Sequence, residues 1–288
     1  MLTLRGAYTA LITPLKEDGA IDYDGWHRLI EFQIDNGIDG LVPLGTTGEN
    51  PTLEHDEEET LLKIMKETVR GRVPVVVGTG SNSTKYAVLY TKRAQERGAD
   101  AALVVTPYYN KPNDSGLVRH FEAVAAVGLP VIVYNIASRC GRNISAALMK
   151  ELAQIPGIIG VKESSGDIAQ IGDIINETGL TLFSGDDALV VPVLALGGAG
   201  VISVISNLMP GKVAALVHAG LNGDFNEARR LHYELLPFMK AAFIETNPVP
   251  IKAAMRWAGL PAGPVRLPLG PLSRESEELL RKALAALA

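Results

Sequence analysis

The stretch that decides the fold is Ile158-Ile159-Gly160-Val161-Lys162-Glu163-Ser164-Ser165-Gly166. Its apolar first half is typical of a strand buried in a parallel sheet, and its polar second half is typical of the loop that follows. Lys162 stands at the junction. An ammonium group against an apolar strand is poorly solvated, which favours the neutral amine, and such a lysine can form a Schiff base with a carbonyl substrate. The simpler alternative is a lysine that reaches solvent or pairs with Glu163.

Eight apolar runs of this kind alternate with amphipathic helical stretches along the 288 residues. The expected strands cover residues 7–12, 40–44, 73–78, 101–106, 130–135, 158–162, 181–184 and 200–204. The expected helices cover residues 23–36, 56–70, 84–97, 116–126, 146–154, 168–177, 187–196 and 211–221. Eight such units predict an α/β fold, the (β/α)8 TIM barrel. A doubly wound open sheet is the alternative, but the glycine-rich dinucleotide turn that usually follows its first strand is absent.

The strand pattern stops at about residue 224. Helices are expected beyond it at 224–243, 250–258 and 273–287. The sequence therefore predicts a catalytic barrel over residues 1–223, followed by a C-terminal helical region over residues 224–288.

Composition restricts the partners of this chain. Its formal net charge is -5, so nothing suggests binding to nucleic acid. Glycine, proline or charge interrupts each apolar run before it is long enough to span a bilayer, and the start lacks the apolar segment of a secretion signal. Cys140 is the only cysteine. We expect a cytoplasmic protein that acts on small molecules, with no membrane partner.

In a barrel of this kind the catalytic groups lie where the strands end. The sequence places most of its distinctive polar residues at those ends: Thr13, Thr46, Thr47, Thr79, Thr106, Tyr108, Tyr109, Tyr134, Lys162 and Asp186. Chance would scatter such residues over both rims of the barrel. This clustering is the main argument from the residues for an enzyme.

The segment Gly45-Thr46-Thr47-Gly48-Glu49 combines glycines that let backbone amides turn toward a ligand with two hydroxyl groups. Such a nest suits a small carboxylate or phosphate. Phosphate is less favoured because no Lys or Arg flanks the segment and the Walker spacing is absent. The alternative is an ordinary turn with a threonine that caps the next helix.

Two side chains at and after the fifth expected strand extend this site. A phenol relays protons when it is hydrogen-bonded beside an amine and a hydroxyl, so Tyr134 joins Lys162 and Thr46 as a candidate catalytic group. Arg139, on the loop that follows, is able to hold a carboxylate with two parallel hydrogen bonds. The alternatives are a tyrosine that serves packing and an arginine that is solvated.

No metal site is expected. The histidines show no metal-ligand spacing, and these are His27, His55, His120, His218 and His232. The pair Asp186-Asp187 heads an expected helix, where an N-cap is a simpler role than cation binding.

These segments together resemble the dihydrodipicolinate synthase branch of the pyruvate-dependent class I aldolases, from about residue 6 to residue 271. The double tyrosine, Arg139 and the Asn-Pro-x-Pro-x-Lys segment point to the synthase branch within the wider superfamily. The segments that carry the resemblance are Gly45-Thr46-Thr47-Gly48-Glu49, Pro107-Tyr108-Tyr109-Asn110-Lys111-Pro112, Tyr134-Asn135, Arg139, Gly141, Val161-Lys162-Glu163, Ser184-Gly185-Asp186-Asp187, Gly200-Val201-Ile202-Ser203-Val204 and Asn247-Pro248-Val249-Pro250-Ile251-Lys252.

The resemblance implies a condensation of two small molecules. Lys162 would form an imine with pyruvate, and the derived enamine would attack L-aspartate 4-semialdehyde to give 4-hydroxy-tetrahydrodipicolinate, for lysine and diaminopimelate biosynthesis. No cofactor beyond this covalent imine is implied. The catalytic residues would be Lys162, Tyr134, Thr46 and Tyr109, and the substrate-binding residues would be Thr47, Arg139, Ile202 and Gly185.

The resemblance also implies a homotetramer built from tight dimers, in which Tyr109 crosses the dimer interface to complete the relay. This chain departs from the family around Arg139, where Ala137 and Cys140 replace a common proline and threonine. The change predicts a less rigid loop and removes no catalytic group.

A second departure concerns regulation. Members of the family that lysine inhibits carry a histidine and a glutamate at the positions of Glu58 and Tyr86. His55, Asn82 and Tyr108 still match that effector site. Because two polar partners are missing, we expect weak or absent inhibition by lysine.

Two other functions remain open at this point. A lyase of the same superfamily would cleave N-acetylneuraminate or a 2-keto-3-deoxy sugar acid through the same lysine, but a polyhydroxylated substrate calls for hydroxyl-binding groups in place of Arg139. A non-catalytic barrel that binds a keto acid would be expected to have lost at least one of the four catalytic residues.

Overall fold

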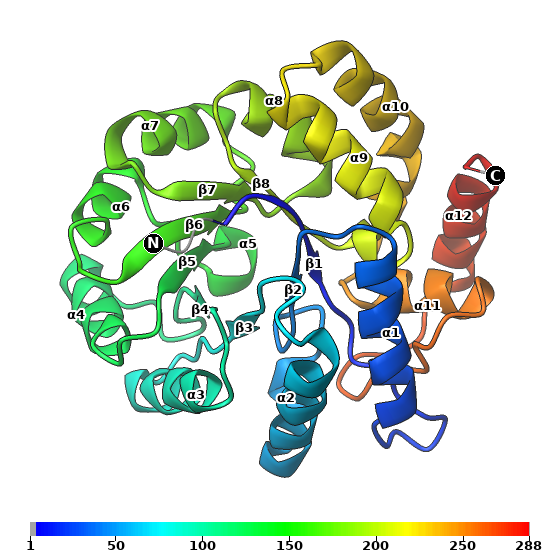
Figure 1. The fold of residues 1–288 in the computed structure, drawn as a ribbon, viewed down its shortest axis with the longest axis horizontal. Helices are drawn as coiled ribbons and strands as arrows, with labels where there is room; N and C mark the ends of the chain where they lie inside the picture. The colour runs from blue at the N-terminus through cyan, green and yellow to red at the C-terminus, as the bar shows by residue number, and fades with distance from the viewer. Residues whose placement is uncertain (1–3, 288) are drawn as a thin grey trace.

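The computed structural model describes residues 4–287 and shows a ring of parallel strands surrounded by helices (Figure 1). The strands form one sheet in the order β2-β1-β8-β7-β6-β5-β4-β3. A parallel bridge between Leu41 and Val75 joins β2 to β3 and completes the ring. The predicted (β/α)8 barrel is therefore confirmed. Its strands are β1 (Gly6–Ala10), β2 (Gly40–Val42), β3 (Val76–Gly78), β4 (Ala101–Val105), β5 (Val131–Asn135), β6 (Ile158–Glu163), β7 (Thr181–Ser184) and β8 (Gly200–Ser203).

Each predicted helix of the barrel overlaps an observed one. The helices of the barrel are α1 (Tyr23–Asp35), α2 (His55–Val69), α3 (Thr84–Glu96), α4 (Asp114–Ala125), α6 (Ala146–Leu152), α7 (Ile168–Thr178), α8 (Val190–Ala195) and α9 (Pro210–Leu221). Three single turns of 3-10 helix lie among them: η1 (Asn50–Thr52), η2 (Asp187–Leu189) and η3 (Ile205–Asn207).

The strands divide the apolar core into two layers because successive side chains point to opposite faces. On β5, Val131 and Val133 pack in the large layer between the sheet and the helices, whereas Ile132 and Tyr134 pack inside the barrel. Inside the barrel, Tyr8 and Phe183 meet edge to face, with ring centroids 5.1 Å apart. The same alternation directs the last inward side chain of each strand toward the mouth of the barrel.

One α-helix of the barrel was not predicted. Residues expected to form a loop after the fifth strand form the short helix α5 (Ala137–Cys140), which ends at Gly141 with a positive φ of 67°. The thiol of Cys140 donates a hydrogen bond to the carbonyl oxygen of Thr106, 3.0 Å away. Four residues are too few to show a helical period in a sequence, so this turn depends on its tertiary contacts.

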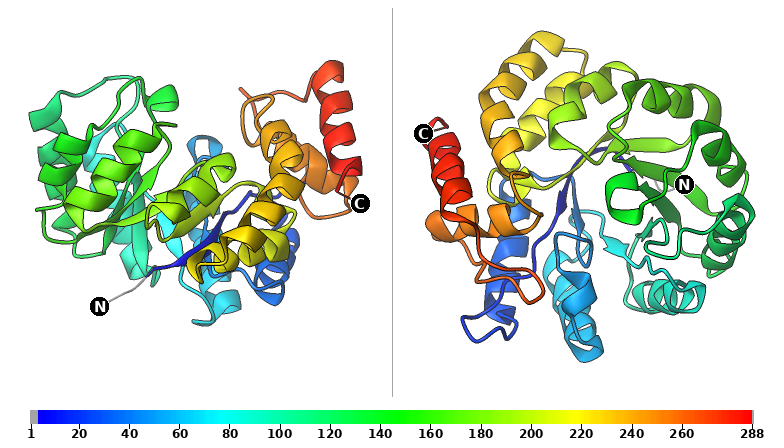
Figure 2. Two further views of the ribbon diagram at one scale, coloured as in Figure 1. Left: turned by 90° about the horizontal axis from the view of Figure 1, so that it is seen from above. Right: turned by 180° about the vertical axis from the view of Figure 1, so that it is seen from behind.

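The predicted C-terminal helices are also present. They are α10 (Phe225–Ala241), α11 (Val249–Trp257) and α12 (Arg274–Ala285). Helix α10 packs against α8 and α9, α12 packs against α10 and α11, and the group lies on one side of the barrel (Figure 2). Within residues 4–287, no helix combines the length and the apolar character needed to cross a membrane.

A buried ion pair attaches α11 to the barrel. Lys252 Nζ lies 2.6 Å from Glu49 Oε1, and each side chain is only 2% exposed. Lys252 Nζ also donates to the carbonyl oxygen of Thr13 at 3.0 Å, and the backbone N–H of Arg266 donates to Glu49 Oε2 at 2.8 Å. The loop after β2 is therefore held by residues more than 200 positions further along the chain.

We predict that Lys252→Met destabilises the fold by about 3–5 kcal/mol, because the carboxylate of Glu49 would be left buried without its counter-ion. Urea unfolding followed by circular dichroism measures this loss. The double variant Glu49→Gln, Lys252→Met should recover much of it, since no unpaired charge then remains buried. A double variant as unstable as the single one would contradict this account.

Candidate active site

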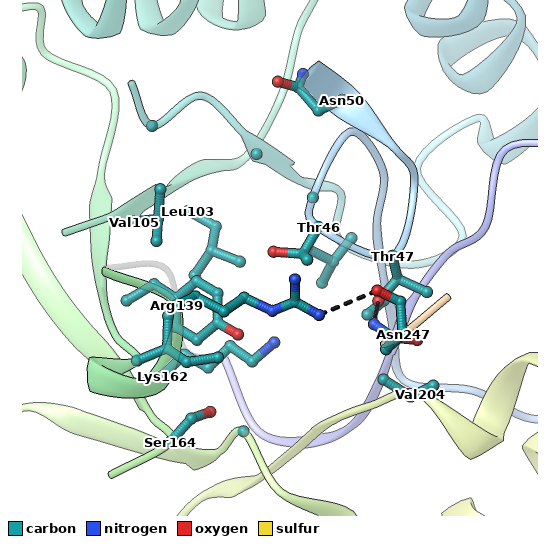
Figure 3. A pocket seen from close by; sticks show the side chains of 18 of the residues that line it. Thr46, Thr47, Asn50, Leu103, Val105, Arg139, Lys162, Ser164, Val204 and Asn247 are labelled. Atoms are coloured by element: carbon teal, nitrogen blue, oxygen red, sulfur yellow. Dashed lines mark hydrogen bonds between the residues drawn. The ribbon is translucent and has the colours of Figure 1, made fainter. Parts of the chain in front are cut away.

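A cavity of about 270 Å³ opens at the carboxyl ends of the strands. The residues on its wall come from most of the strand ends and from the C-terminal region (Figure 3). Among them are Thr46, Thr47, Tyr134, Arg139, Lys162, Gly185 and Asn247. The structure thus brings together residues as distant in the sequence as Thr47 and Asn247, which are 200 positions apart.

The amine of Lys162 lies against the ring of Tyr134. These residues are paired in register on β5 and β6, and Lys162 Nζ is 4.2 Å from the centroid of the Tyr134 ring. Both side chains are almost fully buried, with exposures of 5% and 6%. Within residues 4–287, Lys162 forms no ion pair, so its amine is free to meet a ligand.

The alternative of a lysine that reaches solvent or pairs with its neighbour is therefore wrong. Lys162 is buried, and the side chain of Glu163 points to the opposite face of the sheet. There Glu163 accepts a hydrogen bond of 3.0 Å from Asn135 Nδ2.

The predicted nest lies across the barrel from Lys162. It follows β2, which is four strands from β6 in either direction around the ring. Its backbone is folded by hydrogen bonds from the N–H of Gly48 to the Gly45 carbonyl and from the N–H of Glu49 to the Thr46 carbonyl, both 3.1 Å. Thr46 lines the cavity, whereas the hydroxyl of Thr47 accepts a hydrogen bond of 2.9 Å from Asn247 Nδ2.

Arg139 extends from α5 across the cavity toward the nest (Figure 3). Its Nη2 donates to the carbonyl oxygen of Asn247 at 3.0 Å. The residue is otherwise exposed, so most of its donors remain available to a ligand that enters the cavity. A guanidinium at the mouth of a cavity is suited to a carboxylate.

The two remaining residues predicted to bind substrate differ in position. Gly185 lines the cavity beside Lys162, and a Cβ there would lie 1.8 Å from Ser164 Oγ. Glycine is therefore required at this position for the Ser164 hydroxyl to lie where it does. Ile202 lies in the apolar layer inside the barrel, and Val204, two residues further on, lines the cavity.

Tyr109 is not part of the cavity wall in this chain. Its side chain is 90% exposed, and its backbone has a positive φ of 73°. The neighbouring Tyr108 does line the cavity. A large exposed aromatic side chain on a strained backbone is consistent with a contact outside the single chain.

The prediction that the pair Asp186-Asp187 caps a helix is wrong. Neither side chain caps a helix, because Asp187 is buried and accepts hydrogen bonds from Ser203 Oγ and from the backbone N–H of Val204, the latter at 3.0 Å. Asp187 therefore fixes the end of β8. Asp186 lines the cavity, where burial raises the pKa of its carboxyl and the nearby Lys162 ammonium opposes that rise.

Among the cavity residues that were missed as site residues in the sequence are Ser164, Asp186 and Asn247. A signal for Ser164 existed, since it stands two positions after Lys162 on an extended segment and must share its face. Asn247 gave no such signal, because its place in the cavity depends on the docking of α11. Within residues 4–287, no cluster of three or more His, Cys, Asp or Glu side chains is arranged to hold a metal ion.

Comparison with known proteins identifies the family. A family model described as the dihydrodipicolinate synthetase family matches residues 3–287. The chain belongs to this family. A 4-hydroxy-tetrahydrodipicolinate synthase from Protochlamydia amoebophila is 50% identical over 287 residues, which cover 98% of this chain and 96% of that protein.

Solved structures of synthases superpose closely. The chloride-inhibited dihydrodipicolinate synthase from Acinetobacter baumannii, in complex with pyruvate, is 37% identical with a TM-score of 0.97 over 99% of each chain. The synthase from Cyanidioschyzon merolae, with lysine bound, is 40% identical with a TM-score of 0.95 over 98% of each chain. Members of the family are thus known with pyruvate and with lysine.

A second hollow lies beside the active site of this dihydrodipicolinate synthetase family member. It is lined by His55, Glu58, Tyr86 and Tyr108, whereas Asn82 is not on its wall. Burial raises the pKa of Glu58 to about 7, although the nearby Arg93 and a 3.0 Å hydrogen bond from Asn50 Nδ2 act against this. The Glu58 side chain is 14% exposed.

We predict that Glu58 makes the fold less stable as the pH rises. The folded protein holds this proton up to about pH 7, whereas the unfolded chain releases it near pH 4.5, so stability is lost across that interval. In Glu58→Gln the loss should be smaller. Between about pH 5 and pH 8 the thermal midpoint of the variant should therefore fall less than that of the parent. The exposed Glu122→Gln is the control, and equal pH slopes for all three proteins would contradict the prediction.

Proposed function

We propose that this chain condenses pyruvate with L-aspartate 4-semialdehyde, through an imine on Lys162, to give 4-hydroxy-tetrahydrodipicolinate for lysine and diaminopimelate biosynthesis. The observation that carries the proposal is a buried amine, 4.2 Å from the ring of Tyr134, that lies across one cavity from the turn containing Thr46 and Thr47. The family match and the relatives named above support it. The imine with the substrate supplies the electron sink, so the proposal calls for no separate cofactor.

The first half of the reaction concerns pyruvate. The nest around Thr46 and Thr47 holds its carboxylate, aided by the backbone of Ile202, so that the ketone carbon faces Lys162 from across the barrel. The amine adds to that carbon, water leaves, and loss of a methyl proton gives an enamine. Tyr134 and Thr46 carry the protons for these steps, since a phenol and a hydroxyl border the same cavity as the amine.

The second half concerns the semialdehyde. The enamine carbon attacks the aldehyde carbon, and Arg139 at the mouth holds the carboxylate of this substrate. The guanidinium already donates one hydrogen bond to the Asn247 carbonyl, which limits its freedom before the substrate arrives. Gly185 lines the cavity beside the lysine, where the semialdehyde enters.

We further propose a homotetramer built from tight dimers, acting in the cytoplasm. The exposed Tyr109 supports the dimer, because a catalytic role for this residue requires it to enter the cavity of a second copy. Its strained backbone, with a φ of 73°, is consistent with a conformation kept for such a contact.

We predict that Lys162→Ala abolishes the condensation, because no other lysine lines the cavity within residues 4–287. A coupled assay with dihydrodipicolinate reductase measures turnover, and borohydride reduction in the presence of pyruvate followed by mass spectrometry measures the adduct. The exposed Lys150→Ala is the control and should keep both signals. An adduct of undiminished yield on Lys162→Ala, or release of pyruvate from N-acetylneuraminate as the faster reaction of the native chain, would overturn the proposal.

We also predict weak or absent inhibition by lysine. The hollow that holds His55 and Tyr108 carries Glu58 and Tyr86 in place of the histidine and glutamate of lysine-inhibited members. The initial rate should therefore change little with lysine up to about 1 mM, a concentration that saturates sites of micromolar affinity. The double variant Glu58→His, Tyr86→Glu should gain inhibition. Strong inhibition of the native chain below about 1 mM would refute the prediction.

A further inference from the structure

Ser164 has a buried hydroxyl group that no step described so far uses. The residue is 9% exposed, and it lines the cavity. Among the atoms of residues 4–287, Ser164 Oγ has no hydrogen-bond partner. A buried hydroxyl without a hydrogen-bond partner lowers the stability of the fold. Its presence on the wall of a binding cavity points to a ligand that supplies the missing hydrogen bond.

The position of Ser164 relative to Lys162 is set by the strand. Residues two apart on an extended segment share a face, and the hydroxyl therefore points toward the same cavity as the amine. Gly185, directly after the neighbouring strand β7, lies against both of them. A Cβ added at Gly185 would lie 1.8 Å from Ser164 Oγ and 3.0 Å from Lys162 Cε, so the hydroxyl and the end of the lysine side chain pack side by side against this glycine.

Ser164 lies on the far side of the lysine from the nest. Thr46 follows β2, which is diametrically opposite β6 in the ring, and Figure 3 shows Thr46 and Ser164 on opposite sides of Lys162. The nest holds the carboxylate of the pyruvate imine in the proposed reaction. The methyl carbon, bonded to the same central carbon, then points away from the nest. That carbon is the one that attacks the aldehyde.

We propose that the Ser164 hydroxyl binds the aldehyde oxygen of the second substrate and stabilises the charge that develops there. This inference rests on the proposed condensation and adds a residue to it. Ser164 touches the substrate only in the second half of the reaction, because the pyruvate carboxylate is held on the opposite wall.

The chemical step balances with the groups already present. The enamine carbon forms a bond to the aldehyde carbon, and the π electrons of the carbonyl group move to its oxygen. The nitrogen lone pair of the enamine forms the iminium, and the oxygen takes a proton from the relay that includes Tyr134. Ser164 keeps its own proton and donates a hydrogen bond to this oxygen, in the manner of an oxyanion hole.

The test compares Ser164→Ala with Ser164→Thr, which keeps the hydroxyl, and with Ser165→Ala as the matched control. Ser165 stands next along the chain, does not line the cavity, and donates its backbone N–H to Glu163 Oε1 at 2.7 Å. Steady-state assays vary the semialdehyde at saturating pyruvate. A separate measurement follows imine formation with pyruvate alone, by borohydride trapping and mass spectrometry.

Ser164→Ala should lower kcat/KM for L-aspartate 4-semialdehyde on the order of 10- to 100-fold, the range expected for one donor to a developing oxyanion. It should leave the rate of imine trapping unchanged, and Ser164→Thr should recover most of the loss. The thermal midpoint of Ser164→Ala should stay equal or rise, since a buried hydroxyl without a partner is removed.

Three outcomes would overturn the inference. One is an unchanged kcat/KM for the semialdehyde in Ser164→Ala. Another is an equal loss in the imine-forming step, which would assign the hydroxyl to pyruvate. The third is an equal loss in Ser165→Ala, which would indicate a structural effect. A native chain that forms no imine at all would contradict the proposed function itself, and this result is distinguishable from the other three.

Discussion

A buried ion pair between Glu49 and Lys252 joins the parts of the site that lie farthest apart in the sequence. Two buried charges lose their hydration, so such a pair contributes little net stability, but any packing that leaves one charge alone is strongly disfavoured. This requirement fixes the start of α11 against the loop that follows β2. Asn247, two residues before the helix begins, is thereby set against the hydroxyl of Thr47, and its carbonyl receives Arg139. The C-terminal helices thus help to shape a cavity whose buried lysine, Lys162, lies on the barrel.

The ring of strands then determines how the proposed catalytic groups face one another. The register of β5 with β6 sets Tyr134 beside Lys162, and the position of β2 across the ring sets the nest opposite both. A substrate held between opposite walls has few orientations available, and this is the advantage of building a site from many strand ends. Polar residues on the outer face of the same strands keep the register. Glu163, adjacent to the lysine, accepts from Asn135 Nδ2 on the neighbouring strand at 3.0 Å.

Much of this arrangement was predictable because it depends on local pattern. Apolar runs indicated all eight strands, and the end of each run located Thr46, Tyr134 and Lys162 at the mouth of the barrel. The resemblance to a family supplied a role for Tyr109 that spacing alone did not. Features that depend on contacts across the fold were missed or misjudged. The helix α5 is too short to show a period, and the supposed helix cap at Asp187 instead accepts hydrogen bonds from the end of β8.

The unpaired polar atoms show where structure and function place different demands on the chain. Unsatisfied buried atoms also occur on His120, Arg142 and His232, away from the cavity, so the lack of a partner does not by itself mark a site. Ser164 differs from these three because it lines the cavity and because its hydroxyl packs against Gly185 beside the end of the Lys162 side chain. An alanine at Ser164 would still allow the strand end to form, and it would remove an unsatisfied group. A hydroxyl that lowers the stability of the empty protein is explained by the hydrogen bond that it makes when substrate fills the cavity.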